Sequence, residues 1–315
     1  GIQSKKENYM NWISKFIKPK IKSLFKKKAS TVEETLWISC ECKNLIYKED
    51  FEKNFYCCPK CGVHHKLSCK DRFRLFFDNG AYELIDTPIP VDDPLNFVDN
   101  KKYKDRLRDA RKKTGQDDAI LIAKGKIKNI DVIVGAQDFR FIGGSFGAAS
   151  GEAFITAVQH SINNKDPLIF FSCSGGQRMM ESSIALMQMT RTSLAVNELK
   201  KNNIPYIVVI TNPTTGGVTA SWAMLGDIIL AEKGSVCGFA GKRVIQDTVR
   251  ETLPDEFQTA EYVKDHGFLD LVLERKYLNS TIGTLLSVML KKSETQAKKE
   301  TKNAITIDQS LQSAS

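Results

Sequence analysis

The sequence predicts an α/β protein in which strand–turn–helix units follow one another as a spiral, preceded by a small zinc ribbon. Two observations lead to this fold class. Three apolar, strand-like runs each end near a pair of glycines and lead into a helix-like segment. In addition, six of the eight cysteines lie within residues 40–69, a concentration typical of a metal-binding ribbon.

The central unit begins with the apolar run Leu168–Cys173, which is of strand type, and ends at Gly175 and Gly176. In the predicted helix that follows, apolar residues recur at helical spacing, so we expect one face to lie against a sheet. These residues are Met180, Ile184, Met187 and Leu194. The first amides of such a helix have no partner within it. The unit can therefore aim bare N–H groups at a developing oxyanion.

The same pattern occurs twice more in the chain. The repeats are Ile207–Ile210 with Gly216 and Gly217 ahead of a predicted helix, and Val132–Val134 with Gly143 and Gly144 ahead of a helix near Glu152–Ile162. No Gly-Lys-Ser/Thr follows any of these glycines, and their spacing does not fit a dinucleotide-binding fingerprint. The glycine pairs are therefore not predicted to hold nucleotide phosphates.

Four segments of the chain form a distinctive set: FSCSGGQRMMES, MQMTRTS, NPTTGGVTASWAMLGD and GFAGKRVIQDTVRETLPDEFQ. They resemble the β subunits of bacterial acetyl-CoA carboxylase carboxyltransferase, and the resemblance extends from about Trp37 to about Leu290. The resemblance implies a crotonase-like (ClpP/crotonase) fold. It also implies transfer of a carboxyl group from carboxybiotin to acetyl-CoA, which forms malonyl-CoA for fatty-acid synthesis. Gln177 and Met180 stand where the family more often has Ala and Gln.

For catalysis we predict that the amides of Gly175 and Gly176 form an oxyanion hole for the acetyl thioester, and that Gly216 and Gly217 line the same wall. The sequence shows no Ser-His-Asp arrangement, and its four histidines have no motif around them. The resemblance implies that the freed biotin nitrogen takes the methyl proton. The protein would then position the reactants, while the cofactor does the acid–base work.

The cysteine cluster predicts one structural zinc ion held by Cys40, Cys42, Cys58 and Cys61. The second pair has the C-x-x-C spacing of a zinc knuckle, whereas the first pair is C-x-C, one residue shorter than in the family. Alternative ligands within reach are Cys57, His64, His65 and Cys69. A disulfide framework is the competing interpretation, but a chain this long without a signal peptide does not need one.

The net charge of +9 suggests nucleic-acid binding until the charges are located. Residues 1–30 hold nine lysines and one glutamate, whereas the region between the two ends of the chain is near neutral. Within that region, one basic cluster precedes the first glycine pair. We predict that its members Lys101, Lys102, Lys104 and Arg106 bind the phosphates of coenzyme A.

The predicted organisation is a basic amphipathic extension (residues 1–35), the zinc ribbon (36–70), the crotonase-like carboxyltransferase domain (71–290) and a disordered polar tail (291–315). No apolar run is long enough to span a bilayer, and a cytoplasmic location is expected.

The sequence lacks a Met-Lys-Met biotin site and an ATP-binding motif. The resemblance therefore implies three partners: a carboxyltransferase α subunit in an α2β2 assembly, a biotin carboxyl carrier protein and a biotin carboxylase. Activity is expected only with the α subunit. Two alternatives remain open, a crotonase-type acyl-CoA hydratase or decarboxylase and a zinc-ribbon nucleic-acid-binding protein. Nucleic-acid binding is also possible as a secondary activity.

Overall fold

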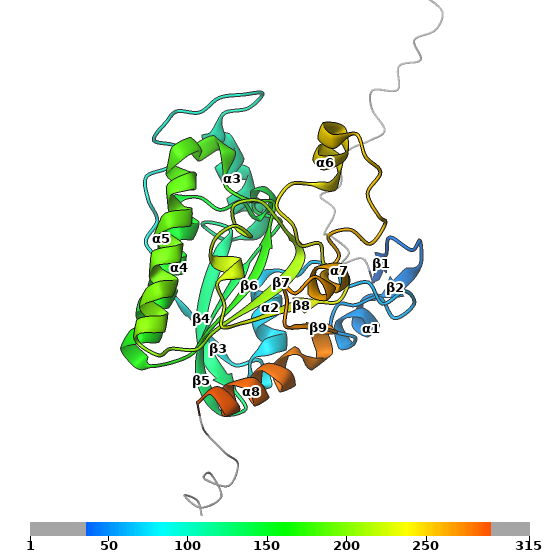
Figure 1. Ribbon diagram of the computed structural model, residues 1–315, viewed down its shortest axis with the longest axis vertical. Helices are drawn as coiled ribbons and strands as arrows, with labels where there is room; N and C mark the ends of the chain where they lie inside the picture. Colours follow the sequence, from blue (N-terminus) through cyan, green and yellow to red (C-terminus); the bar gives the residue numbers. More distant parts are fainter. Residues whose placement is uncertain (1–35, 291–315) are drawn as a thin grey trace, which may run out of the picture.

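The computed structural model describes residues 36–290, so the predicted extension (1–35) and tail (291–315) lie outside the described residues. Its main element is a seven-stranded sheet in which β3, β4 and β5 are antiparallel and β5 to β9 run parallel (Figure 1). The strands, in spatial order, are β3 (Tyr82–Ile85), β4 (Ile120–Ile127), β5 (Ile130–Gln137), β6 (Leu168–Ser174), β7 (Tyr206–Thr214), β8 (Ile228–Glu232) and β9 (Leu271–Leu273).

Helices cover both faces of this sheet, with α4 and α5 on one face and α2 and α8 on the other (Figure 1). The helices are α2 (Cys69–Phe76), α3 (Tyr103–Thr114), α4 (Ala148–Asn164), α5 (Ser182–Lys201), α6 (Lys242–Val249), α7 (Ala260–Asp265) and α8 (Leu278–Met289). Every residue of β6 is buried, and its successive residues Phe170 and Phe171 pack into opposite helical layers. Among residues 36–290, no helix has the length and apolar character needed to cross a membrane.

Two of the three predicted units are present, and the third is only partly present. β5 leads through a turn into α4, and β6 leads into α5. After Gly216 and Gly217, however, only a 3₁₀ turn at Trp222–Met224 separates β7 from β8, where we predicted a helix. Trp222 anchors this short connection, because its fully buried ring contacts Phe154 and Phe170.

The predicted buried face of the helix after β6 was wrong. Met180 is buried just before α5, but Met187 and Leu194 are 57% and 62% exposed, and the buried side of α5 carries other residues, most of them small or polar. These are Ala185, Gln188, Thr192, Ala195, Val196 and Leu199. The reason is the close approach of α4, because a Cβ on Gly151 would lie 2.0 Å from Gln188 Oε1. The helical spacing of the apolar residues therefore did not predict which face of α5 is buried, because close packing against α4 buries a different face.

The ribbon comprises β1 (Trp37–Ser39), β2 (Leu45–Tyr47) and α1 (Lys48–Lys53), and it is tied to the body by a buried carboxylate. Glu232, at the end of β8, accepts hydrogen bonds from Arg72 and from Arg275, whose Nε and Nη2 lie 2.8 Å from its oxygens. Arg275 also donates to the carbonyls of Phe55 and His65 at 2.9 and 2.8 Å. One arginine thus joins the sheet to the segment that carries the cysteines.

We predict that Glu232→Gln lowers the free energy of unfolding by about 3–5 kcal/mol at neutral pH, because two guanidinium groups stay buried without their carboxylate. Burial raises the Glu232 pKa, but Arg72 and Arg275 outweigh it and hold the pKa well below its usual range. The carboxylate's contribution is therefore complete above the unfolded pKa of about 4.3 and is lost as the pH falls through the folded value.

Urea unfolding from pH 8 down to pH 3 checks this expectation, since the difference between wild type and Glu232→Gln should shrink only at the acid end. Glu83→Gln is the control, because Glu83 is paired with Lys124 at the surface, where its side chain is 71% exposed. Its loss should cost less than about 1 kcal/mol. Equal effects of the two substitutions would contradict the prediction.

Candidate active site and zinc centre

The turns after β5 and β6 are joined through their backbones. Gly144 has a φ of +62°, and a Cβ on it would lie 2.0 Å from the carbonyl oxygen of Cys173. Its own carbonyl accepts hydrogen bonds from Gln137 Nε2 at 2.6 Å and from Ser174 Oγ at 2.7 Å. Phe146 N–H donates to the carbonyl of Gly176 at 2.9 Å. The two turns therefore form one rigid ledge at the carboxyl ends of the strands.

The turn after β7 lies against this ledge, and the contact is between glycines. Gly176 has a φ of +115°, and a Cβ on it would lie 3.3 Å from Gly216 Cα. A Cβ on Gly216 would in turn lie 3.0 Å from Gly176 Cα. The structure thus brings the predicted residues Gly175, Gly176, Gly216 and Gly217 together in one place. They form a backbone wall in which a side chain would not fit between the two turns.

The amides of this wall differ in how they are hydrogen-bonded. Gly175 N–H donates to the Gly143 carbonyl at 2.9 Å, and Gly176 N–H donates to Ser174 Oγ at 3.0 Å. Gly216 N–H donates to the Phe239 carbonyl at 2.9 Å. Within residues 36–290, the buried Gly217 N–H has no acceptor. An unpaired buried N–H is costly, which makes it a donor available to a ligand.

A buried ionic network that sequence analysis missed lies behind the wall. Arg178, only 1% exposed, binds the Asp118 carboxylate with both Nη atoms, at 2.6 and 2.9 Å. Burial lowers the Arg178 pKa, but Asp118 outweighs this effect and the pKa is raised. Glu181 is also buried, and its Oε2 accepts the N–H of Ala148 at 2.6 Å, at the start of α4. The sequence feature that could have revealed this network is the spacing of Arg178 and Glu181, which are three residues apart and follow a glycine pair.

The predicted coenzyme A residues lie at the start of α3, which packs beside the ledge through Tyr103, Leu107, Phe141 and Met180. Lys101 is paired with Asp109, and Arg106 is paired with Asp99. Lys102 and Lys104 are exposed and have no carboxylate partner among the described residues. Two of the four side chains are therefore free to bind an anionic ligand, while two already hold acids.

The four predicted zinc ligands lie together in the ribbon. The sulfurs of Cys40, Cys42, Cys58 and Cys61 are all within 4.8 Å of one another. Cys40 and Cys61 are 3.6 Å apart, and Cys42 and Cys58 are 3.8 Å apart. A tetrahedral ion with Zn–S bonds of about 2.3 Å requires sulfur separations of about 3.8 Å. Each of these two separations joins one cysteine of the C-x-C pair to one of the C-x-x-C pair, so both pairs face one position where zinc would fit.

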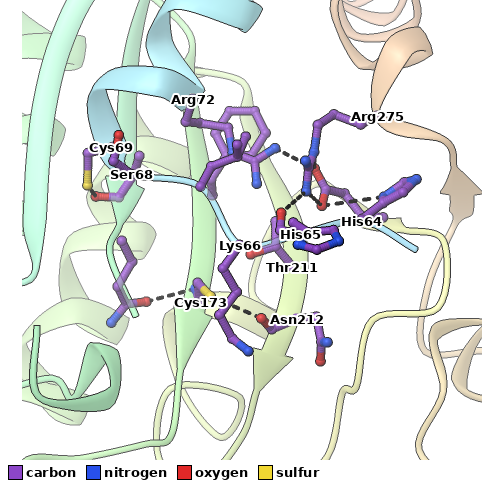
Figure 2. Close-up of a pocket in the computed structure, with 15 residues that line it drawn as sticks. His64, His65, Lys66, Ser68, Cys69, Arg72, Cys173, Thr211, Asn212 and Arg275 are labelled. Atoms are coloured by element: carbon purple, nitrogen blue, oxygen red, sulfur yellow. Dashed lines mark hydrogen bonds and ion pairs between the residues drawn. The ribbon is translucent and has the colours of Figure 1, made fainter. Parts of the chain in front are cut away.

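The alternative ligands lie outside this sulfur cluster. His65 Nε2 is 3.4 Å from Cys40 Sγ, which makes it a neighbour of the cluster. His64, His65 and Cys69 line a small cavity of about 10 Å³ at the carboxyl ends of the strands β5 to β8, and the side chains of Arg72 and Arg275 point toward one another beside it (Figure 2). Cys57 Sγ is directed to the Phe55 carbonyl at 3.5 Å.

Two family models and curated relatives match the chain. The carboxyl transferase domain matches residues 94–313, and the acetyl-CoA carboxylase zinc finger domain matches residues 37–61. The acetyl-coenzyme A carboxylase carboxyl transferase subunit beta of Pelagibacter ubique is 54% identical over 90% of this chain and 93% of its own length. The same subunit of a Chelativorans species is 48% identical over 91% and 93%.

Solved structures agree on the fold. A transcarboxylase 12S chain superposes with a TM-score of 0.56 at 21% identity, over 76% of this chain and 43% of that chain. A Pseudomonas malonate decarboxylase hetero-tetramer gives a TM-score of 0.55 at 19% identity, over 70% of this chain and 81% of that chain. The predicted crotonase-like fold with an N-terminal zinc ribbon is confirmed. The chain belongs to the family of acetyl-CoA carboxylase carboxyl transferase β subunits, which are biotin-dependent carboxyl transferases.

Proposed function

We propose that this chain transfers the carboxyl group of carboxybiotin to acetyl-CoA at the glycine wall, forming malonyl-CoA. The observation that carries the proposal is the contact between the Gly176 and Gly216 turns beside an unpaired Gly217 amide, in a chain of this family. Bound carboxybiotin supplies CO2 and a nitrogen that accepts the methyl proton. The chain's own part is to bind acetyl-CoA and to stabilise the enolate that forms from it.

The enolate oxygen would lie against the glycine wall, where fixed amides cost no reorganisation during the reaction. Gly217 N–H is the first donor, because the described residues offer it no acceptor. Gly176 N–H is the second, because its present acceptor is a side-chain hydroxyl, Ser174 Oγ, and not a backbone carbonyl. Gly175 N–H is held by a carbonyl, so its predicted role as a donor requires a shift of the Gly143 turn.

The exposed lysines of α3 are proposed to bind the phosphates of coenzyme A. Lys102 and Lys104 lie at the first turn of this helix, are exposed and form no ion pair within residues 36–290. Lys101 and Arg106 would contribute after exchanging their acidic partners, Asp109 and Asp99, for a phosphate.

The remaining components are proposed as partners of this chain in the cytoplasm. A carboxyltransferase α subunit, in an α2β2 assembly, would supply the biotin-facing half of the site. The carrier protein would deliver biotin, and a biotin carboxylase would load it. None of the four histidines serves the glycine wall: His64 and His65 lie beside the ribbon, His160 lies on α4 and His266 ends α7.

We predict that the purified chain alone has negligible transferase activity, because one crotonase-like unit supplies only one wall of the site. Adding a matching α subunit should give decarboxylation of malonyl-CoA in the presence of biotin, followed as acetyl-CoA formation. Robust activity without the α subunit would refute the requirement for that partner. Lack of activity in a folded, zinc-loaded complex would refute the proposed function.

Gly176→Ala should lower kcat of the complex about 100-fold, since a Cβ at this φ displaces the backbone that faces Gly216. Gly267→Ala is the control, because Gly267 also has a positive φ, of +83°, and has nothing within 4 Å of the added Cβ. Gly267→Ala should lose about 1 kcal/mol of stability and Gly176→Ala at least as much, but only Gly176→Ala should lose activity. Steady-state kinetics and thermal unfolding of both variants test this. Equal kcat values would contradict the proposed catalytic role of the glycine wall.

Zinc content should be about one ion per chain and should fall in Cys42→Ser, because the sulfur cluster then loses one of its thiolates. Cys57→Ser provides a matched control at a thiol outside the cluster and should keep its zinc. Metal analysis of the two purified variants by mass spectrometry checks this. Retention of zinc by Cys42→Ser would show that another residue completes the site.

A further inference from the structure

We propose that Arg178, together with Asp118, Tyr103 and Glu181, is a positioning device that sets the geometry of the glycine wall and links it to α3. The inference rests on the proposed function, because it assigns these residues an effect on the wall that stabilises the enolate. None of the four touches the reacting atoms in this assignment. They act through the backbone of the turns.

The first part of the device is the clamp that Arg178 forms on the neighbouring turn. Its Nη2 donates to the Ser145 carbonyl at 2.6 Å, and its Nε donates to Ser145 Oγ at 3.0 Å. Its backbone N–H donates to the Phe146 carbonyl at 2.9 Å. Asp118 fixes the plane of the guanidinium by two bonds and is itself held by Ser150 Oγ at 2.7 Å. The residue that follows the Gly175–Gly176 turn thus fixes the turn that follows β5.

The second part runs from α3 to the start of α4. Tyr103 OH donates to Glu181 Oε1 at 2.6 Å and accepts from Arg178 Nη1 at 3.2 Å. Glu181 Oε2 accepts the Ala148 N–H at 2.6 Å. A Cβ on Gly147 would lie 2.5 Å from both Glu181 oxygens, so no side chain fits between them. A movement of α3 would therefore be transmitted to the Gly143–Gly147 turn by the Tyr103 hydroxyl and the Glu181 carboxylate.

Burial makes this chain of contacts stiff. Tyr103 and Arg178 are each 1% exposed, Asp118 is 5% exposed and Glu181 is 6% exposed. Charge-assisted hydrogen bonds between buried groups are strong, and a buried guanidinium that loses one partner is left with an unpaired donor. The turns therefore have one favourable position relative to α3. Because oriented groups lose activity steeply when displaced, this position is expected to set kcat.

Tyr103→Phe tests the device, because it removes one hydroxyl and keeps the buried ring. The matched control is Tyr206→Phe: Tyr206 is also fully buried, lies at the start of β7, and donates its OH to the Trp222 carbonyl at 3.0 Å, outside the turns at residues 143–148 and 175–178. Tyr206→Phe should lose about 1 kcal/mol of stability, and Tyr103→Phe about 1.5–3 kcal/mol, because its hydroxyl bonds two charged groups. In the complex with the α subunit, only Tyr103→Phe should lower kcat, by about tenfold, with the KM for malonyl-CoA changed less than about twofold.

Amide hydrogen exchange gives a second readout that a purely structural role would not move. Tyr103→Phe should accelerate exchange in residues 143–148 and 175–178, whereas Tyr206→Phe should not. Equal kcat values and equal exchange in the two variants, with an active wild-type complex, would overturn the positioning role. An inactive wild-type complex would instead refute the proposed function, so the two failures are distinguishable.

Discussion

The carboxylate of Glu232 lies between two buried guanidinium groups at the end of β8, and the arrangement of the chain depends on it. Arg72 connects it to α2, and Arg275 connects it to the carbonyls of Phe55 and His65 in the cysteine-bearing segment. The Glu232 carboxylate thus connects the end of β8, the helix α2 and the ribbon. Such a cluster is stable only when complete, because each ion was desolvated to form it.

The candidate site differs from this ion cluster, because its central surface consists of backbone atoms and not of charged side chains. Gly176 and Gly216 lie so close that a Cβ on either would contact the Cα of the other. The wall therefore presents backbone amides and no side chains. Side chains lie behind this surface, where Arg178 and Glu181 form hydrogen bonds with the turn that follows β5. The division separates the groups that face the substrate from the groups that fix their geometry. It also explains why a site of this kind carries no catalytic triad.

Much of this could be predicted from the sequence, because the informative residues are close together along the chain. The predicted strand Leu168–Cys173, its glycine pair and the four predicted zinc ligands all lie in short local patterns. Asp118 and Arg178 are sixty residues apart and form their pair only through the fold. The exposed face of α5 was also missed, since the approach of Gly151 to Gln188 leaves no trace in the spacing of apolar residues.

The contact between Gly176 and Gly216 also limits how this enzyme can change during evolution. A substitution at either glycine meets backbone atoms, which have no alternative rotamer to adopt. A Cβ on Gly217 instead meets the side chains of Gln177 and Met189, at 2.5 and 2.8 Å. A side chain at Gly217 could therefore be accommodated by exchanging Gln177 and Met189 for smaller residues, while the peptide groups of the wall stay in place.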